Sequence, residues 1–234
     1  MPHDDNTLWA DVDGYICDLL VDHDSALAET LRSSEAADLP PISVPPNQGK
    51  LLHLLARLRG ARTILELGTL GGYSTVWLAR ALPADGSLVT VEADPERASL
   101  AGRNIDAAGL SGLVDIRVGS AAEVLAAMLD RGEGPFDFIF LDADKQSYPR
   151  YLELSIELAH PGTVIVGDNV VRRGEVANEA STDESVRGVQ RFLEMLAADD
   201  RIDATAIQTV GTKGHDGFAL AVVNGRAAPD ARRT

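Results

Sequence analysis

Cysteine is nearly absent from this chain of 234 residues, in which Cys17 is the only example. A single cysteine excludes an internal disulfide and a zinc site built from thiolates, and it suits a reducing compartment such as the cytoplasm. Because a free cysteine packs like a small apolar side chain, we expect Cys17 in the hydrophobic core.

Long apolar runs and an excess of positive charge are also lacking. No stretch approaches the roughly 20 apolar residues of a membrane span, and the acidic N-terminus lacks the basic start of a secretory signal. The formal net charge is −15, and the first forty residues contain ten acidic residues and one basic residue. Because this charge repels nucleic acid and anionic lipid, we expect neither as a partner, and we expect a soluble, cytoplasmic protein.

Aromatic residues make up 5% of the chain, and its five histidines are scattered. So few rings give no stacking cluster that would mark a ligand pocket, and the dispersed histidines argue against a zinc site.

The remaining composition, with 45% hydrophobic and 24% charged residues, is typical of one globular domain spanning 1–234. Apolar residues at helical spacing predict helix over 6–36 with a break at 21–24. Four prolines in "LPPISVPPNQGK" then end helix formation, and a further helix over 51–58 should end at the cap residue Gly60. We expect a helical N-terminal extension, an α/β core and a frayed tail, over 1–40, 41–223 and 224–234.

From residue 63 onward, apolar strands alternate with amphipathic helices. Predicted strands occupy 63–68, 87–93, 113–119, 136–143, 163–169, 204–210 and 218–223. Predicted helices between them occupy 74–81, 95–109, 121–129, 148–159 and 186–199. Apolar strands separated by helices indicate a parallel sheet covered on both faces, and the last two strands predict an antiparallel hairpin. The expected fold is α/β, Rossmann-like and doubly wound, with a mostly parallel seven-stranded sheet.

The glycine turn "LELGTLGGYS" follows the first strand and opens a helix, where a doubly wound sheet binds nucleotides. Glu92 ends the next strand about 20 residues after Gly72, the usual distance for an acid that holds ribose hydroxyls. A nicotinamide-dependent oxidoreductase would suit both features, but Leu70 stands where its fingerprint needs glycine beside a pyrophosphate. The turn reads E-x-G-x-x-x-G instead, and its glycines could also serve only the packing of strand against helix.

Acidic and amide side chains follow two consecutive strands. "FLDADK" and "VIVGDNV" place Asp142, Asp168 and Asn169 at the same edge of a parallel sheet. Two carboxylates and an amide are hard oxygen ligands that suit Mg²⁺, with Mn²⁺ or Ca²⁺ as substitutes. Alternatively, these acids cap the helices that follow or line a turn.

The glycine turn, "DADK" and "DN", in this order, resemble the cation-dependent O-methyltransferases of the caffeoyl-CoA and catechol type. This family belongs to the class I S-adenosylmethionine-dependent enzymes, and the likeness is closest to its bacterial members. It covers about residues 40–223 and includes "PPNQGKLL", "GTLGGYSTVWLARALP", "DADKQSYPRYL" and "QTVGTKGHDGFALAVV". The resemblance implies methylation of one hydroxyl of a catechol-like aromatic molecule and, by analogy, a homodimer. A cofactor-binding protein without turnover stays open as an alternative.

Residue by residue, the resemblance implies a metal site, a base and a cofactor site. Asp142, Asp168 and Asn169 would bind the cation, and catalysis would rest on Asp142 and Lys145. A free phenol has a pKa near 10, so Lys145 would take the proton of an acceptor hydroxyl that the cation makes easier to ionise. The implied contacts of S-adenosyl-L-methionine are Val44, Glu66, Gly68, Thr69, Ser74, Glu92, Ala121 and Asp144.

The roles of Lys145 and of the two arginines at 172 and 173 each have a second interpretation. Lys145 could form only an ion pair with Asp142 or Asp144. Arg172 and Arg173 lie in the stretch where relatives shape their substrate mouth, and they could contact an acidic substrate or belong to a solvated loop.

Overall fold

The computed structural model describes residues 5–225, and the rest of the predicted tail, 226–234, lies outside the described residues. The α-helices are α1 (Asp5–Leu20), α2 (Ser25–Ala36), α3 (Pro46–Arg59), α4 (Tyr73–Ala79), α5 (Pro95–Ala107), α6 (Ala121–Asp130), α7 (Tyr148–Glu157) and α8 (Glu184–Ala198). The strands are β1 (Thr63–Leu67), β2 (Ser87–Glu92), β3 (Val114–Val118), β4 (Phe136–Leu141), β5 (Ala159–Asp168), β6 (Ile202–Gly211) and β7 (Gly214–Val223). Two short 3₁₀ helices are η1 (Lys145–Ser147) and η2 (Arg172–Ala177).

The seven strands form one sheet in the order β3-β2-β1-β4-β5-β7-β6. β1 pairs in parallel with β2 and β4, β2 pairs in parallel with β3, and β4 pairs in parallel with β5. β7 runs antiparallel to both β5 and β6. The predicted fold is therefore confirmed, and the carboxyl ends of β1, β2, β4 and β5 lie at one edge, where sheets of this kind bind ligands.

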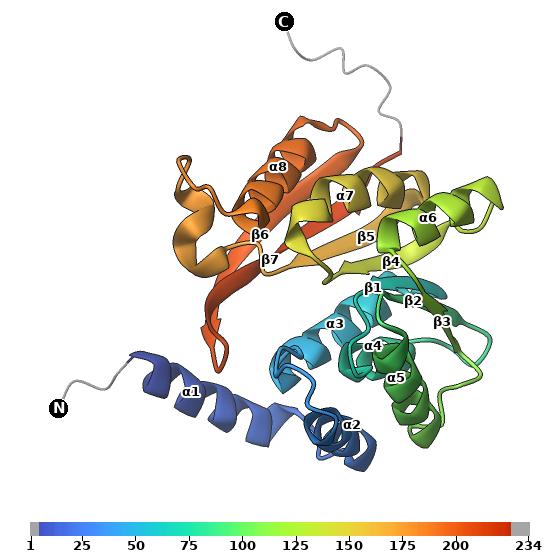
Figure 1. The fold of residues 1–234 in the computed structure, drawn as a ribbon, viewed down its shortest axis with the longest axis vertical. Coiled ribbons are helices and arrows are strands. Elements are labelled where there is room, and N and C mark those ends of the chain that lie inside the picture. Colours follow the sequence, from blue (N-terminus) through green and yellow to red (C-terminus); the bar gives the residue numbers. More distant parts are fainter. Residues whose placement is uncertain (1–4, 226–234) are drawn as a thin grey trace, which may run out of the picture.

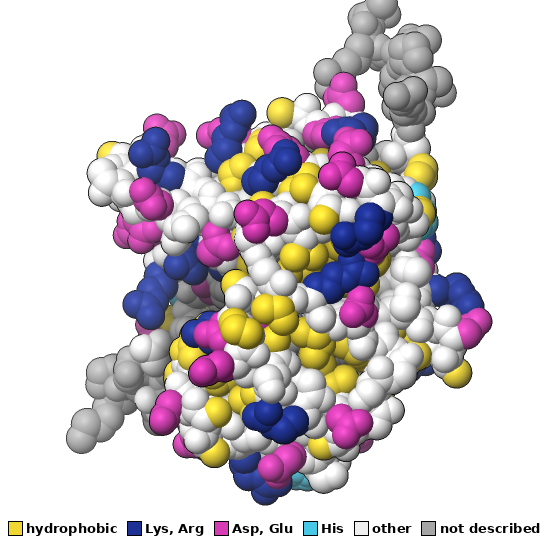
Figure 2. Space-filling model, turned by 45° about the vertical axis from the view of Figure 1, so that its right-hand side comes forward, with side chains coloured by type: hydrophobic (Ala, Val, Ile, Leu, Met, Phe, Trp, Pro, Cys, Tyr) yellow, Lys and Arg dark blue, Asp and Glu magenta, His cyan; other side chains and the backbone are white. Residues whose placement is uncertain are grey.

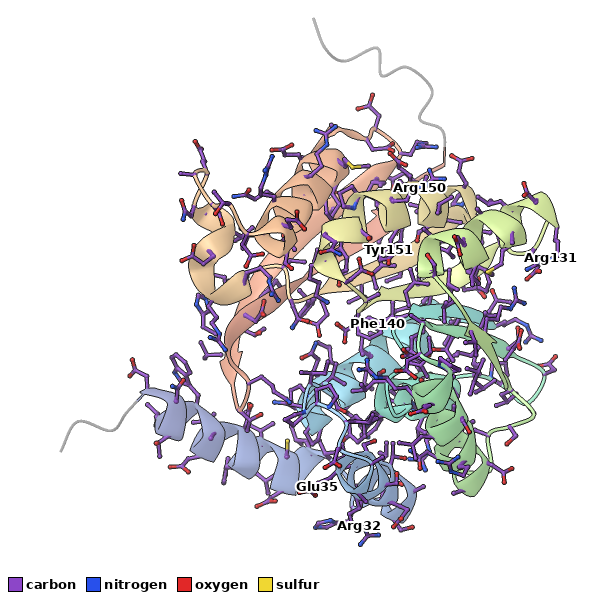
Figure 3. The ribbon with its side chains drawn as sticks, viewed as in Figure 1. Arg32, Glu35, Arg131, Phe140, Arg150 and Tyr151 are labelled. Carbon is purple, nitrogen blue, oxygen red and sulfur yellow. The ribbon has the colours of Figure 1, made fainter. Side chains whose placement is uncertain are left out.

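Helices cover both faces of the sheet (Figure 1): α6, α7 and α8 on one face, and α3, α4 and α5 on the other. Successive side chains of a strand point to opposite faces, so Ile139 of β4 packs in the first core while Phe138 and Phe140 pack in the second. Phe140 is labelled in Figure 3. Each such buried side chain contributes roughly 1.5–3 kcal/mol to folding.

Local signals set the break before α2 and the end of α3 as predicted, but α3 begins before the predicted start at 51, because proline is tolerated at the first position of a helix. α2 begins after Asp24, whose side chain accepts a hydrogen bond from the Leu27 backbone N–H at 2.9 Å. This cap coincides with the predicted break at 21–24. α3 starts with Pro46 and ends at Gly60, which takes the left-handed conformation with φ of 68°.

The N-terminal helices lie at the periphery of the fold (Figure 1). Arg80 after α4 donates to both carboxylate oxygens of Asp24, at 2.6 and 3.1 Å, and so ties the start of α2 to the core. The prediction that Cys17 belongs to the core is wrong, because α1 contacts α3 and β6 from outside and leaves this thiol half-buried.

The C-terminal part extends the predicted hairpin. β6 and β7 pair from Ile202–Val223 to Gly211–Gly214, so the turn is tighter than the sequence indicated. The stretch before α8 contains η2. No helix within residues 5–225 is both long and apolar enough to cross a membrane.

Candidate active site

A cavity of about 760 Å³ opens at the carboxyl edge of the sheet. Its walls come from the glycine turn after β1, the end of β2, the start of α6 and the "DADK" segment after β4. The volume suits a small-molecule ligand. The predicted functional residues that line it are Val44, Gly68, Thr69, Ser74, Glu92, Ala121, Asp142, Asp144, Lys145 and Asn169.

The glycine turn needs glycine for steric reasons at the point nearest β4. Gly68 has a φ of 95°, and Gly72 has a φ of 88°. A Cβ atom added to Gly68 would lie 2.3 Å from the carbonyl oxygen of Asp142. Close packing, the alternative explanation for these glycines, is therefore real, and it also brings the turn against Asp142 within the same cavity.

Glu92 ends β2 with its carboxylate held by two backbone N–H groups. Leu70 N donates to Oε2 at 2.8 Å, and Asp94 N donates to Oε1 at 3.0 Å. An ionised carboxylate has about four acceptor positions. Glu92 therefore joins the glycine turn to the next loop while it keeps acceptor capacity on the cavity side.

Glu66 differs from the other predicted cofactor contacts, because its carboxylate lies behind the cavity wall rather than on it. Ser74 Oγ donates to Oε1 at 2.6 Å, Thr90 Oγ1 donates to Oε2 at 2.7 Å, and Thr75 Oγ1 also donates to Oε2. Complete burial raises the pKa of Glu66 to about 7, although the three hydroxyls oppose the shift. Because Ser74 lines the cavity, Glu66 is placed to orient that hydroxyl.

Asp144 lines the cavity and accepts a hydrogen bond from the hydroxyl of Tyr151 on α7. Tyr151, labelled in Figure 3, lines the cavity as well. Burial and the adjacent Asp144 carboxylate raise the pKa of Tyr151, so its hydroxyl stays protonated and keeps Asp144 oriented. Tyr151 was not predicted from the sequence, although it lies in the "DADKQSYPRYL" stretch.

Asp142, Asp168 and Asn169 come together at the adjacent ends of β4 and β5, as predicted. Asn169 lines both the first cavity and a second one of about 580 Å³, which Asp168 also lines. The Asn169 backbone has a φ of 58°, and its N–H donates to Asp168 Oδ1 at 2.8 Å. Burial raises the pKa of Asp168 to about 7, and the nearby charge of Asp142 adds to the shift.

These residues fit a hard divalent cation. Two carboxylates and an amide offer only oxygen donors, and a positive charge between the acids would relieve the repulsion that raises the pKa of Asp168. Within residues 5–225, no group of three or more His, Cys, Asp or Glu side chains is placed to hold a metal ion. The amide of Asn169 is the third protein ligand that the sequence predicts beside Asp142 and Asp168.

Lys145 lies in η1 with its ammonium group almost completely enclosed. Its Nζ donates to Asp142 Oδ1 at 2.8 Å and to the hydroxyl of Tyr148 at 2.8 Å. Burial favours a lower pKa for Lys145, but Asp142 and Tyr148 outweigh it and raise the pKa. The ion pair that the sequence left as an alternative is thus present.

Tyr148 is a buried residue of the site that was not predicted from the sequence. Its hydroxyl lies 2.6 Å from the carbonyl oxygen of Leu141 and 2.9 Å from that of Asp168, at the ends of β4 and β5. The same oxygen accepts the hydrogen bond from Lys145. The spacing of one helical turn between Lys145 and Tyr148 was the available signal.

Known proteins with similar sequences are O-methyltransferases. The O-methyltransferase family model matches residues 18–222. A catechol O-methyltransferase from Niastella koreensis is 52% identical over 218 residues, covering 93% of this chain and 99% of that protein. A catechol O-methyltransferase from Mycobacterium tuberculosis is 46% identical over 213 residues, covering 91% of this chain and 95% of that protein.

Solved structures show the same likeness. An O-methyltransferase from Bacillus cereus in complex with SAH has a TM-score of 0.92 at 51% identity, covering 94% of this chain and 100% of that one. The O-methyltransferase TomG from Streptomyces achromogenes, in complex with SAM, has a TM-score of 0.92 at 49% identity, covering 95% of this chain and 100% of that one. The chain therefore belongs to the O-methyltransferase family and is an S-adenosylmethionine-dependent O-methyltransferase.

Proposed function

We propose that this enzyme methylates one hydroxyl of a catechol-like, vicinal dihydroxy aromatic molecule and that it needs a divalent cation, Mg²⁺ with Mn²⁺ or Ca²⁺ as substitutes. The observation that carries the proposal is the meeting of two sets of residues in one cavity. Glu92 and Asp144 are among the predicted cofactor contacts that line this cavity. The predicted metal ligands Asp142 and Asn169 and the predicted base Lys145 line it too. The relatives named catechol O-methyltransferase support the class of acceptor.

The cofactor side of the proposal assigns roles to the glycine turn and the acids around it. Glu92 would accept hydrogen bonds from the ribose hydroxyls, which its position at the end of β2 favours. Ser74, whose hydroxyl donates to Glu66, would accept a hydrogen bond from the ammonium of the amino-acid end of S-adenosylmethionine. Val44, Gly68, Thr69, Ala121 and Asp144 would complete the contacts.

The acceptor side rests on Asp142, Asp168 and Asn169, which would hold the cation. When bound, a divalent cation supplies positive charge that favours ionisation of an adjacent acceptor hydroxyl. Lys145 would then accept the proton at Nζ. While Asp142 is paired with Lys145 alone, the ammonium stays protonated. A cation held by Asp142 would weaken this pairing, and Lys145 would then release its proton to solvent before it accepts the proton of the acceptor hydroxyl.

Two alternatives from the sequence are set aside, because the chain is an O-methyltransferase. A nicotinamide-dependent oxidoreductase is disfavoured because this chain belongs to the O-methyltransferase family. A protein without turnover is disfavoured by the intact acids, amide and lysine around the cavity.

A homodimer and a cytoplasmic location also belong to the proposal. The exposed apolar side chains of α1 favour a second copy of the chain as the partner. The single cysteine favours a reducing compartment.

Removal of metal tests the proposal directly. We expect a chelator to abolish methylation of catechols and added Mg²⁺ or Mn²⁺ to restore it, as measured by mass spectrometry of the product. We also expect catechols to be methylated much faster than their monohydroxy analogues, which offer one oxygen instead of two. Full activity in chelator, or equal rates on the two kinds of acceptor, would sink the metal role.

Matched variants separate the metal from the base. Asp168→Ala should lose activity that added metal does not restore, yet keep its affinity for S-adenosylmethionine. Asp115→Ala on β3 is the control and should keep both the activity and the affinity. Lys145→Ala should lose about 10²–10⁴ in rate, partly recovered at higher pH, because the proton step alone is impaired. An unimpaired Lys145→Ala variant would reduce this lysine to the ion pair seen in the structure.

A further inference from the structure

The second cavity, of about 580 Å³, adjoins the first at the proposed metal residues. Asn169 and Arg172 line both cavities, and Asp168 lines the second. Its other walls come from the loop before α3 and from the β6–β7 hairpin. An acceptor whose hydroxyls lie at Asp168 and Asn169 would therefore have space for the rest of its molecule here.

Arg172 enters this junction from a sharply bent backbone. Arg172 and Arg173 have φ values of 55° and 57°, a left-handed conformation that costs a side-chain-bearing residue roughly 1 kcal/mol or more. Asp216 holds the bend: its Oδ1 accepts hydrogen bonds from Val171 N and Arg172 N, both at 3.1 Å, and from Gly217 N at 3.0 Å. The position of Arg172 is thus fixed by a strand that lies far from it in the sequence.

The guanidinium of Arg172 has no anionic partner within residues 5–225. No ion pair of these residues includes Arg172, and its buried Nε has no hydrogen-bond partner. The acids nearby are engaged elsewhere, because Asp216 binds the backbone and Asp13 accepts from Asn47 Nδ2 and Thr212 N, both at 2.8 Å. A ligand anion would supply the acceptor that the buried Nε of Arg172 lacks.

We propose that the natural acceptor is a catechol that carries a carboxylate, as in a dihydroxybenzoate, and that Arg172 binds this carboxylate in the second cavity. This inference rests on the proposed function and adds the chemical class of the acceptor. A guanidinium presents paired N–H groups that match the two oxygens of a carboxylate. Arg172 is therefore a residue that determines acceptor specificity.

The charge of the whole molecule strengthens the need for a local cation. A net charge of −15 repels an anionic acceptor, so its binding requires positive charge inside the site. Arg173 and Lys213 line the second cavity too, and Lys213 Nζ donates to the carbonyl oxygen of Pro41 at its edge. Figure 2 shows a hollow toward the left of the drawn face, with Lys or Arg side chains along its edge.

The test compares 3,4-dihydroxybenzoate with 3,4-dihydroxybenzamide, which has the same shape without the charge. Each is assayed for methylation and titrated calorimetrically into protein without methyl donor. Arg172→Met removes the charge, and Arg172→Gly removes it while favouring the observed backbone conformation, so that folding is preserved in at least one variant. Arg103→Met on α5, whose side chain contacts Ser99, controls for the loss of one positive charge.

We expect the wild-type enzyme to prefer the benzoate. Both Arg172 variants should lose roughly 10- to 100-fold in kcat/KM and in affinity for the benzoate, and less than about threefold for the benzamide. Equal losses on both compounds, or equal binding of the two by the wild type, would overturn the inference. Binding of the benzoate that depends on Arg172, without methylation of any catechol, would support the carboxylate site and contradict the proposed function.

Discussion

Glu92 combines two tasks, since its carboxylate binds the backbone of the glycine turn and also lines the cavity. Glu92→Ala should weaken S-adenosylmethionine binding by about 1–3 kcal/mol, because buried ribose hydroxyls lose their acceptor. Isothermal titration calorimetry measures this change. Glu96→Ala, which removes an exposed acid four positions later on α5, is the matched control. Unchanged affinity in Glu92→Ala would contradict the ribose assignment.

Glu66 makes stability depend on pH in an unusual direction for a carboxylate. Burial raises its pKa from 4.5 to about 7, so the folded chain keeps this proton to a higher pH than the unfolded chain. The contribution to the free energy of unfolding is therefore greatest below pH 4.5 and is lost as pH rises to about 7.

Glu66→Gln carries no such proton and provides the comparison. Between pH 5 and 8, the unfolding free energy of wild type relative to Glu66→Gln should fall by roughly 2–3 kcal/mol. Urea unfolding in the presence of a chelator, at several pH values, measures this difference. A difference that stays constant with pH would show that Glu66 titrates normally.

At the scale of elements, the glycine turn and the end of β4 are in close contact. A Cβ at Gly68 would meet the Asp142 backbone, and the φ of 95° is unfavourable for alanine. Gly68→Ala should destabilise the fold by roughly 3 kcal/mol or more and weaken cofactor binding. Gly112→Ala, where an added Cβ meets nothing within 4 Å, should change stability by less than about 0.5 kcal/mol. Thermal and denaturant unfolding measure the stability of both variants. Equal losses of stability in Gly68→Ala and Gly112→Ala would refute the steric explanation.

Elements also show where sequence patterns were sufficient. The cap Asp24 before α2 and Gly60 after α3 act within a few residues, so their effect could be predicted, whereas Pro46 starts α3 within the stretch where we expected helix formation to end. The bend at Arg172 could not be predicted, because Asp216 on β7 holds it. The bend depends on a contact between two segments that are far apart in the sequence and that only the folded sheet brings together.

At the scale of the whole molecule, α1 leaves apolar side chains exposed. Exposed fractions range from 48% to 69% at Leu8, Val12, Tyr15, Leu19 and Leu20. Light scattering coupled to size-exclusion chromatography should give twice the mass of one chain, because a second copy would cover this face. Leu19→Glu should shift the protein toward the monomer, whereas Val118→Glu at the opposite edge of the sheet should not. A monomeric wild type would refute the homodimer.

The sequence by itself determined the order of strands and helices, the glycine turn and the acids that end β4 and β5. These features follow from periodicity and from turn chemistry, which act over short distances along the chain. It also placed Asp142, Asp168 and Asn169 at one edge, since parallel strands present their carboxyl ends together.

Only the tertiary structure decided how those side chains are used. The ion pair of Lys145 with Asp142, the hydroxyl of Tyr148 between two strand ends and the burial of Glu66 behind Ser74 depend on distances across the sheet. The half-buried position of Cys17 depends on where α1 packs. Desolvation and hydrogen bonding between distant segments set these states, and neither acts until the chain has folded.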